Sequence, residues 1–177
     1  LVATVDPTGA PNLAPFSFFT IVSSNPPFLA FAPHRMGRTG SKKDTLRNIE
    51  QVGEFTVSVV TEEIAERVNS CAAPLPYGDS EFEHAGLTPV AAERVKAPLV
   101  AESPVGLECT LEEIRTYGET GGAGSLVVGR VVLMHIDPAL RETSDGSVLP
   151  ERLRAVGRMG GSLWCRTLDT FPLERPD

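Results

Sequence analysis

The stretch Asn12-Leu13-Ala14-Pro15-Phe16-Ser17-Phe18-Phe19 decides how this chain is expected to fold. Residues 11–19 are predicted to form one strand, whose aromatic residues suit a sheet with a buried face. Its small residues would let a flat ligand approach the backbone. Further along, Lys43-Asp44-Thr45 marks a predicted helix start, where free backbone N–H groups favour a phosphate. The two segments together predict a site for a planar ring at one end and a phosphate at the other.

The segments around this stretch predict further strands. Residues 1–5 are rich in β-branched side chains, and the turn Asp6-Pro7-Thr8-Gly9 would join them to residues 11–19 as a hairpin. A breaker at Asn25-Pro26-Pro27 precedes a short apolar strand over 28–32. Because the sequence opens within a strand and without methionine, we expect the natural N-terminus to be missing.

Helices are predicted at three places. Asp44 is the expected N-cap of the first, Leu46, Ile49 and Val52 fall on one face, and Gly53 is the expected stop. After a strand over 55–59, a second helix of about ten residues is expected from the capping position 61. Residues 72–90 are predicted to form a loop with one helical turn over 81–84.

Two longer strands are predicted in the second half of the chain. Residues 106–114 alternate apolar and polar side chains, which predicts a wet face carrying Glu108, Thr110 and Glu112. The pair Glu112-Glu113 breaks this alternation and predicts a bulge or strand end. Residues 125–136 are apolar on both faces, so this strand needs cover from the chain's own helices or from a second subunit.

Composition narrows the class of protein. The 177 residues, 41% of them hydrophobic, suit one globular domain over 1–177, and the short strands predict a mainly β fold: a small closed barrel with flanking helices. A net charge of −7 argues against nucleic acid and against an anionic membrane surface as partners. Three widely spaced cysteines indicate reduced thiols in a cytoplasmic protein and no zinc site.

A resemblance to a known family rests on an ordered set of segments: NLAPFSFF, SSNPP, KKDTLRNI, APLPYGDSEFEHAGL, ESPVGLEC, LVVGRVVLMHID and VGRMGG. In this order the chain resembles flavin-reductase-like proteins, in the branch associated with flavoprotein oxygenases. The resemblance implies an FMN-binding split β-barrel that forms a homodimer, with FMN at the subunit boundary. It implies an NAD(P)H-dependent flavin reductase, with NADH or NADPH as transient substrate, that supplies free flavin or a partner oxygenase. The alternative is a flavoredoxin-like electron carrier without nicotinamide turnover.

The expected cofactor site combines the opening stretch with the basic loop before the first helix. Without the resemblance, a core strand and a solvated basic loop would explain the same residues. The expected FMN-binding residues are Asn12, Ala14, Pro15, Phe16, Ser17, Phe18, Ser23, Arg35, Ser41, Lys43 and Thr45. Thr45 is assigned to the phosphate, around which Arg35, Arg38 and Ser41 are expected to close, and Asp44 is assigned to capping.

The nicotinamide nucleotide is expected to meet Arg158 and Trp164, around a glycine-rich loop over 156–164. Anchoring of the C-terminal loop by Trp164 is an equally good explanation of that residue. No catalytic side chain is expected, because the cofactor carries the hydride chemistry. His135 is predicted to be a satisfied core histidine, and His84 has no assigned role.

Overall fold

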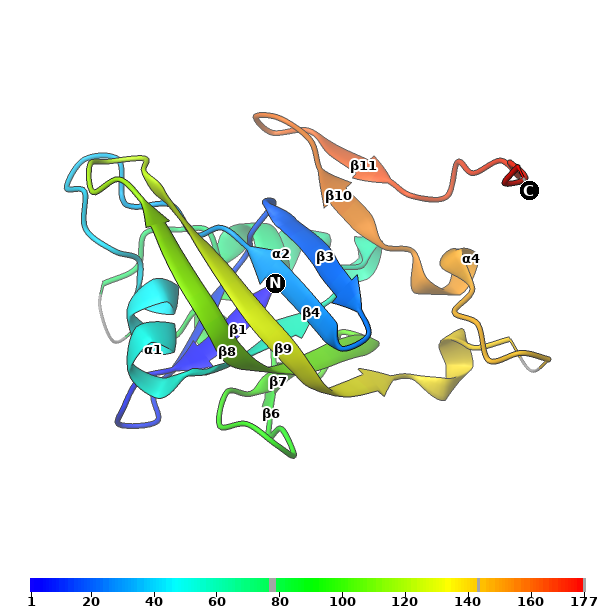
Figure 1. Cartoon of the computed structure of the whole chain (residues 1–177), viewed down its shortest axis with the longest axis horizontal. Coiled ribbons are helices and arrows are strands. Elements are labelled where there is room, and N and C mark those ends of the chain that lie inside the picture. The colour runs from blue at the N-terminus through cyan, green and yellow to red at the C-terminus, as the bar shows by residue number, and fades with distance from the viewer. Residues whose placement is uncertain (77–78, 143, 177) are drawn as a thin grey trace.

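A computed structural model describes residues 1–76, 79–142 and 144–176 (Figure 1). Its main feature is a seven-stranded antiparallel sheet in the order β2-β1-β5-β8-β9-β4-β3. The strands of this sheet are β1 (Val2–Val5), β2 (Pro11–Ala14), β3 (Phe19–Ser24), β4 (Pro27–Phe31), β5 (Glu54–Ser58), β8 (Val105–Tyr117) and β9 (Gly124–Ile136). The expectation of a mainly β fold with flanking helices is confirmed.

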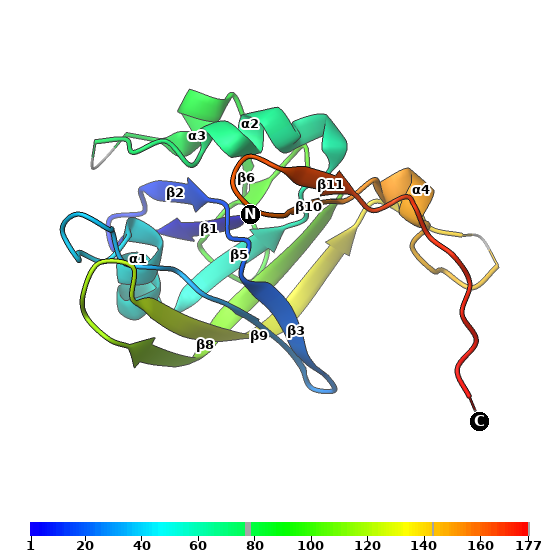
Figure 2. The ribbon, with the colours of Figure 1, turned by 90° about the horizontal axis from the view of Figure 1, so that it is seen from above.

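Short elements surround this sheet (Figure 2). Two small two-stranded sheets stand apart from it: β6 (Pro89–Val90) with β7 (Leu99–Val100), and β10 (Val156–Arg158) with β11 (Trp164–Arg166). The helices are α1 (Asp44–Val52), η1 (Glu62–Ile64), α2 (Ala65–Ser70), α3 (Glu81–Ala85), η2 (Pro138–Leu140) and α4 (Pro150–Leu153). None of the helices in the described part of the chain is long and apolar enough to cross a membrane.

The predicted single strand over 11–19 is wrong in an informative way. The chain leaves the sheet after Ala14 and re-enters it at Phe19, so residues 15–18 form a crossing segment rather than a strand. Since β2 and β3 are the two edges of the sheet, this segment passes from one edge to the other. The two edge strands do not pair, so the expected closed barrel is also wrong and the barrel is split.

Two apolar clusters make up the core. β1 separates them, because Ala3 faces one cluster and Val2 faces the other. The first lies under α2 and α3 and includes Leu13, Ile64, Val68 and Phe82; the second lies inside the barrel against α1 and includes Leu29, Phe31, Leu46, Ile49 and Phe55. Each fully buried side chain of this size contributes roughly 1.5–3 kcal/mol through removal of apolar surface from water.

The N-cap of helix α1 lies one residue earlier in the sequence than predicted. Lys43 occupies the N-cap position, and Asp44 is the first helical residue, paired with Arg47, so its assignment as the cap is wrong. The predicted stop is confirmed: Gly53 has a φ of 75° and donates its N–H to the carbonyl of Ile49 at 2.9 Å. The positive φ explains why glycine suits this position.

The predicted wet face of β8 is wrong at its first residue, Glu108. Glu108 is fully buried, and its carboxylate accepts the backbone N–H groups of Glu93, Arg94 and Val95. It also lies 2.6 Å from Nε2 of His135, so His135 has a polar partner as expected. The predicted bulge is confirmed, because the β8–β9 register shifts between Leu111 and Glu113.

Two further expectations concern the end of the chain. The apolar face of β9 is not fully covered by the described helices, since Val132 and Met134 are 40% and 52% exposed. Residues 156–164, predicted as a glycine-rich loop, instead contain β10 and the start of β11, joined by a turn (Figure 1). The predicted second helix is confirmed as η1 followed by α2, and the turn over 81–84 as α3. Residues 77 and 78 of the predicted 72–90 loop lie outside the described part.

Candidate functional site

Two adjoining cavities lie beside the crossing segment. The first, of about 380 Å³, is bounded on one side by β10 and β11, and we call it the hairpin cavity. The second, of about 410 Å³, lies at the start of α1, and we call it the helix-start cavity. Pro15 and Ala72 line both. The crossing segment therefore joins two spaces that one elongated ligand could fill.

The hairpin cavity is mainly apolar. The structure brings together here five of the residues singled out from the sequence, from opposite ends of the chain: Pro15, Phe16, Ser17, Arg158 and Trp164. The wall is completed by side chains from β3, β5 and α2, among them Phe19, Val57 and Val68. Trp164 is half-buried and packs against the core cluster under α2. A planar aromatic group suits such a wall.

The helix-start cavity carries the polar groups. It is lined by the expected residues Asn12, Ala14, Pro15, Lys43 and Thr45. Arg38 and Thr39, from the loop before α1, add further donors to the same wall. The first backbone N–H groups of a helix have no intrahelical acceptor and carry partial positive charge, so this end suits an anion.

Lys43 links the two cavities. Its Nζ lies 5.8 Å from the centre of the Phe16 ring, within the range of a cation–π contact. Lys42, its neighbour, is instead paired with Glu50 on the surface of α1. Of the two lysines, Lys43 is therefore the one directed toward the site.

Thr45 and Asn12 hold each other in place. Nδ2 of Asn12 donates to Oγ1 of Thr45 at 3.0 Å, and both residues are buried. Because the Thr45 hydroxyl accepts this bond, its own hydrogen stays available for an acceptor in the cavity. Asn12 thus lines the cavity as the support of Thr45 and fixes β2 against α1.

The acidic and thiol groups of the helix-start cavity contribute little unpaired negative charge. The carboxylate of Asp44 is paired with Arg47, and that of Glu81 accepts the N–H of Leu13 at 3.1 Å. Partial burial raises the pKa of Glu81 above its usual value. Burial likewise raises the pKa of the Cys71 thiol to about 11, so the thiol is neutral at physiological pH. The donors of this cavity are therefore opposed by little free negative charge.

Four expected site residues line neither cavity. Phe18 is 63% exposed and stacks near His34 with ring centres 5.0 Å apart, and Ser23 lies on β3. Ser41 is bonded to Thr39, with 2.6 Å between the hydroxyl oxygens. Arg35 donates from Nη1 to the carbonyl of Gly40, while its buried Nε has no partner among the described residues. Arg35 and Ser41 therefore shape the loop before α1.

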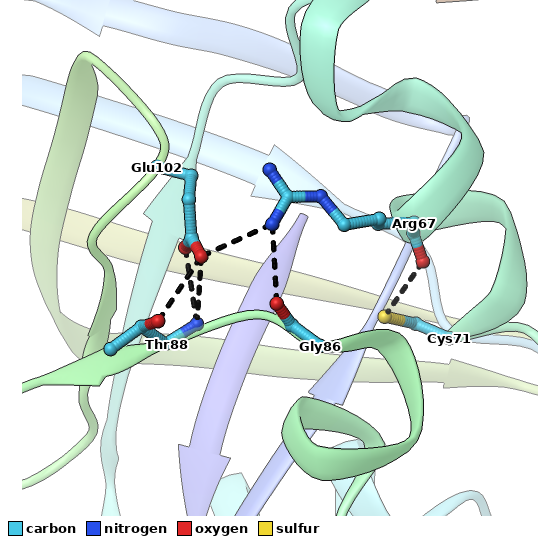
Figure 3. Close-up of polar contacts among 5 residues, drawn as sticks. All are labelled: Arg67, Cys71, Gly86, Thr88 and Glu102. Carbon is cyan, nitrogen blue, oxygen red and sulfur yellow. Dashed lines mark hydrogen bonds and ion pairs between the residues drawn. The ribbon is translucent and has the colours of Figure 1, made fainter.

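Helix α2 lies against the hairpin cavity, the residues directly after it line the helix-start cavity, and its Arg67 ties the helix to neighbouring segments (Figure 3). Nη1 of Arg67 is 3.2 Å from both the Gly86 carbonyl and Oε1 of Glu102. Glu102 also accepts the backbone N–H and hydroxyl of Thr88. Partial burial opposes ionisation of Glu102, yet these hydrogen bonds and Arg67 lower its pKa overall. This network joins α2 to the turn after α3.

Sequence reasoning missed the part of the wall that α2 and the residues after it provide. Cys71, Ala72 and Ala73 line the helix-start cavity, and Val68 and Asn69 line the hairpin cavity. Small residues after a helix carry no signal that distinguishes a ligand wall from an ordinary loop. Arg38, in contrast, was expected from the basic loop to close around the phosphate, and it lines the helix-start cavity.

The residues present fit an FMN-sized ligand. Aromatic and aliphatic side chains line one cavity, and cationic, hydroxyl and helix N-terminal donors line the other, as a ring joined to a phosphate requires. Among the described residues, no group of three His, Cys, Asp or Glu side chains is placed to hold a metal ion.

Comparisons with known proteins agree with this geometry. The family model described as the flavin reductase like domain matches residues 1–152. Protein BH2278 of Halalkalibacterium halodurans is 41% identical over 177 residues, covering 99% of this chain and 83% of the relative.

Two solved structures are similar over almost the whole chain. Nitrilotriacetate monooxygenase component B from Bacillus cereus superposes with a TM-score of 0.90 at 36% identity, covering 97% of this chain and 84% of its own. A split-barrel protein of flavin reductase type from Shewanella frigidimarina superposes with a TM-score of 0.86 at 26% identity, covering 99% and 84%. The fold is therefore the split barrel that the resemblance implied.

Proposed function

The chain belongs to the flavin reductase like family of flavoprotein oxidoreductases, and from this premise we propose that it binds FMN and reduces it with NADH or NADPH. The observation that carries the proposal is the pair of adjoining cavities, one apolar and one rich in donors, joined at Pro15. Free flavin or a partner oxygenase would receive the electrons. The similar Bacillus cereus protein is a monooxygenase component, which supports the second acceptor.

In this proposal the crossing segment holds the cofactor. Phe16 offers an apolar wall to the isoalloxazine ring, and the small side chains of Ala14 and Ser17 leave backbone groups accessible to its polar edge. Lys43, Thr45, Arg38 and the first N–H groups of α1 bind the phosphate.

The β10–β11 hairpin provides the second substrate's side of the site. Trp164 offers a flat surface beside the cavity, and Arg158 offers a cation for a nucleotide phosphate. FMN, when bound, supplies the hydride-accepting and electron-transferring chemistry. The protein's contribution is to orient the two rings and exclude water, so no acid or base from the chain is required.

We also propose that the protein is a homodimer acting in the cytoplasm. The edge strand β3 exposes Phe19, Ile21 and Val22, and β9 exposes Val132 and Met134. An unpaired edge with this much exposed apolar surface favours association. A second copy placed against β3 would also cover the open side of the hairpin cavity, because Phe19 and Ile21 of β3 line that cavity.

The direct test is anaerobic reduction. We expect the purified protein to take up FMN and show a flavin absorbance band that NADH or NADPH bleaches within turnover time. A flavin band that stays oxidised with both nucleotides, but is bleached by a reduced protein partner, would instead support the electron carrier. A protein that binds no flavin contradicts both functions.

A further inference from the structure

The C-terminal hairpin is attached to the body through the packing of Trp164 against the core cluster under α2 and through a small set of polar contacts around Glu62. β10 and β11 form a sheet of their own, so no strand of the main sheet pairs with them. At its root, Val156 donates its N–H to the carbonyl of Val60, and Glu62 donates its N–H to the carbonyl of Arg154, both at 3.0 Å. Figure 2 shows the hairpin close to α2, with the remaining C-terminal residues running away from the body.

Glu62 connects both ends of the hairpin to η1. Its Oε2 pairs with Arg154, just before β10, and its Oε1 pairs with Arg166, the last residue of β11, each at 2.5 Å. Hydrogen bonds from Arg154 and then Arg166 hold the pKa of Glu62 below its usual value, so it is charged at neutral pH. Among the described residues, no other ion pair joins the hairpin to the rest of the chain.

The hairpin's position sets the shape of the hairpin cavity. Val156, Gly157, Arg158 and Trp164 all line that cavity, and the only tryptophan of the chain is among them. A two-stranded hairpin of this length is marginal on its own, so it depends on its attachments. Because Glu62 and its two arginines are partly exposed, their pairing matters more for local opening than for global stability.

We propose that Glu62 is the positioning residue of a lid: the β10–β11 hairpin closes over the hairpin cavity, and the Arg154–Glu62–Arg166 pairing holds it closed. This deepens the proposed function and rests on it, because the lid would control access of the nicotinamide nucleotide. Glu62 lines neither cavity and acts only through the hairpin.

The test compares Glu62→Ala with the matched control Glu63→Ala. Both carboxylates lie in the first turn of η1, but Glu63 has no hydrogen bond or ion pair to the described hairpin residues. In the flavin-free protein, Glu62→Ala should speed amide exchange across residues 156–166 by roughly two- to tenfold, the range expected for exposed ion pairs. It should also shift Trp164 emission to longer wavelength, with the thermal midpoint nearly unchanged.

The kinetic readout uses FMN-loaded protein and NADH. Glu62→Ala should raise the KM for NADH by several-fold with little change in the reduction rate at saturation, and Glu62→Gln, which keeps an oxygen acceptor, should fall between it and the wild type. Equal exchange in the two alanine variants, or faster exchange with an unchanged KM, overturns the lid. Failure of the wild type to bind FMN overturns the proposed function instead, and the exchange comparison remains readable.

Discussion

At the scale of single residues, Lys43 is the side chain on which the phosphate assignment depends. Lys43→Ala should weaken FMN binding by roughly five- to thirtyfold, because a charge-assisted bond of about 1–2 kcal/mol is lost. Riboflavin, which lacks the phosphate, should bind the variant almost as well as the wild type. Fluorescence titration with both ligands measures the difference.

Lys42→Ala is the matched control for this prediction, since Lys42 is paired with Glu50 outside the cavity. Equal weakening of FMN and riboflavin by Lys43→Ala would place the phosphate elsewhere. An effect of Lys42→Ala as large as that of Lys43→Ala would mean that only long-range charge matters.

Glu108 should be among the most sensitive positions for stability. Glu108→Gln puts an amide group among three backbone donors, and we expect a loss of about 2–4 kcal/mol in the free energy of unfolding. Glu112→Gln, on the exposed part of the same strand, should change it by less than about 0.5 kcal/mol. Urea denaturation of both variants checks the contrast, and a similar loss in both would contradict it.

The same carboxylate predicts how stability depends on pH. Burial works against ionisation of Glu108, but hydrogen bonds from Glu93 and His135 lower its pKa overall. A lowered folded-state pKa means that this contribution is present above the ordinary glutamate value of about 4.3 and is lost as pH falls through the folded value. Unfolding measured between about pH 5 and 3 should therefore show a steeper loss in the wild type than in Glu108→Gln.

The fate of Glu108 also shows what local sequence reasoning could not supply. Alternation along residues 106–114 correctly indicated a strand, but the polar side was assigned to water. In the structure, residues 93–98 cover that side, with Lys96 donating its N–H to Glu54 and Thr56 donating to the carbonyl of Pro98. A loop that satisfies its own backbone groups with buried polar side chains leaves no trace in periodicity.

At the scale of elements, the loop before α1 is held by the β8–β9 turn. Arg35 donates its N–H to the carbonyl of Ala123, and Gly122 donates its N–H to the carbonyl of Arg35. A Cβ at Gly121 would lie 2.2 Å from the backbone oxygen of Gly37, which is too close for a non-bonded carbon and oxygen. Gly121 therefore permits the contact that places Arg38 and Thr39 in the helix-start cavity.

Gly121→Ala should accordingly displace that loop. We expect FMN affinity to fall by roughly tenfold or more and stability to fall by about 1–3 kcal/mol, as for other overpacked sites. Gly160→Ala, where an added Cβ meets nothing within 4 Å, should change neither. Titration calorimetry measures the FMN affinity and thermal melts measure the stability of both variants. Full FMN affinity in Gly121→Ala would show that the contact between the β8–β9 turn and the loop before α1 does not shape the FMN site.

Elements were predicted well where neighbouring residues determine them, through a cap or a hydrophobic period. They were predicted poorly where contacts between distant parts of the chain determine them. Gly53 and the apolar face of α1 correctly predicted that helix. The strand break at Pro15 was not predicted, because it depends on Ala14 and Phe19 lying in β2 and β3, at opposite edges of the sheet. Pro15 is evident in the sequence, but the sequence does not show that it separates two strands at opposite edges of one sheet.

At the scale of the whole molecule, the exposed apolar surface predicts a dimer. Light scattering should give about twice the mass of the 18.9 kDa chain at micromolar concentration. Substituting aspartate for both Val132 and Met134 should lower this mass toward that of one chain, because charges would be buried at the interface.

The control for the dimer is Val90→Asp, because Val90 is an exposed apolar residue of β6, which belongs to the separate β6–β7 sheet and not to the sheet that contains β9. A wild-type mass of one chain would contradict the dimer, and an unchanged mass in the double variant would remove β9 from the interface. The sequence indicated that residues 125–136 needed cover on both faces; the exposure of Val132 and Met134 favours a second subunit over the chain's own helices.

The shortness of the crossing segment also limits how far the whole sheet can flatten. Seven strands laid flat at the usual spacing would place the outermost two about 29 Å apart. The five Cα-to-Cα steps from Ala14 to Phe19 can reach at most about 19 Å. The segment is therefore too short to span a flat sheet, and the sheet must curve to bring β2 and β3 within its reach. Pro15 of this segment lines both cavities, so the same short connection that bends the sheet also forms part of the wall of the site.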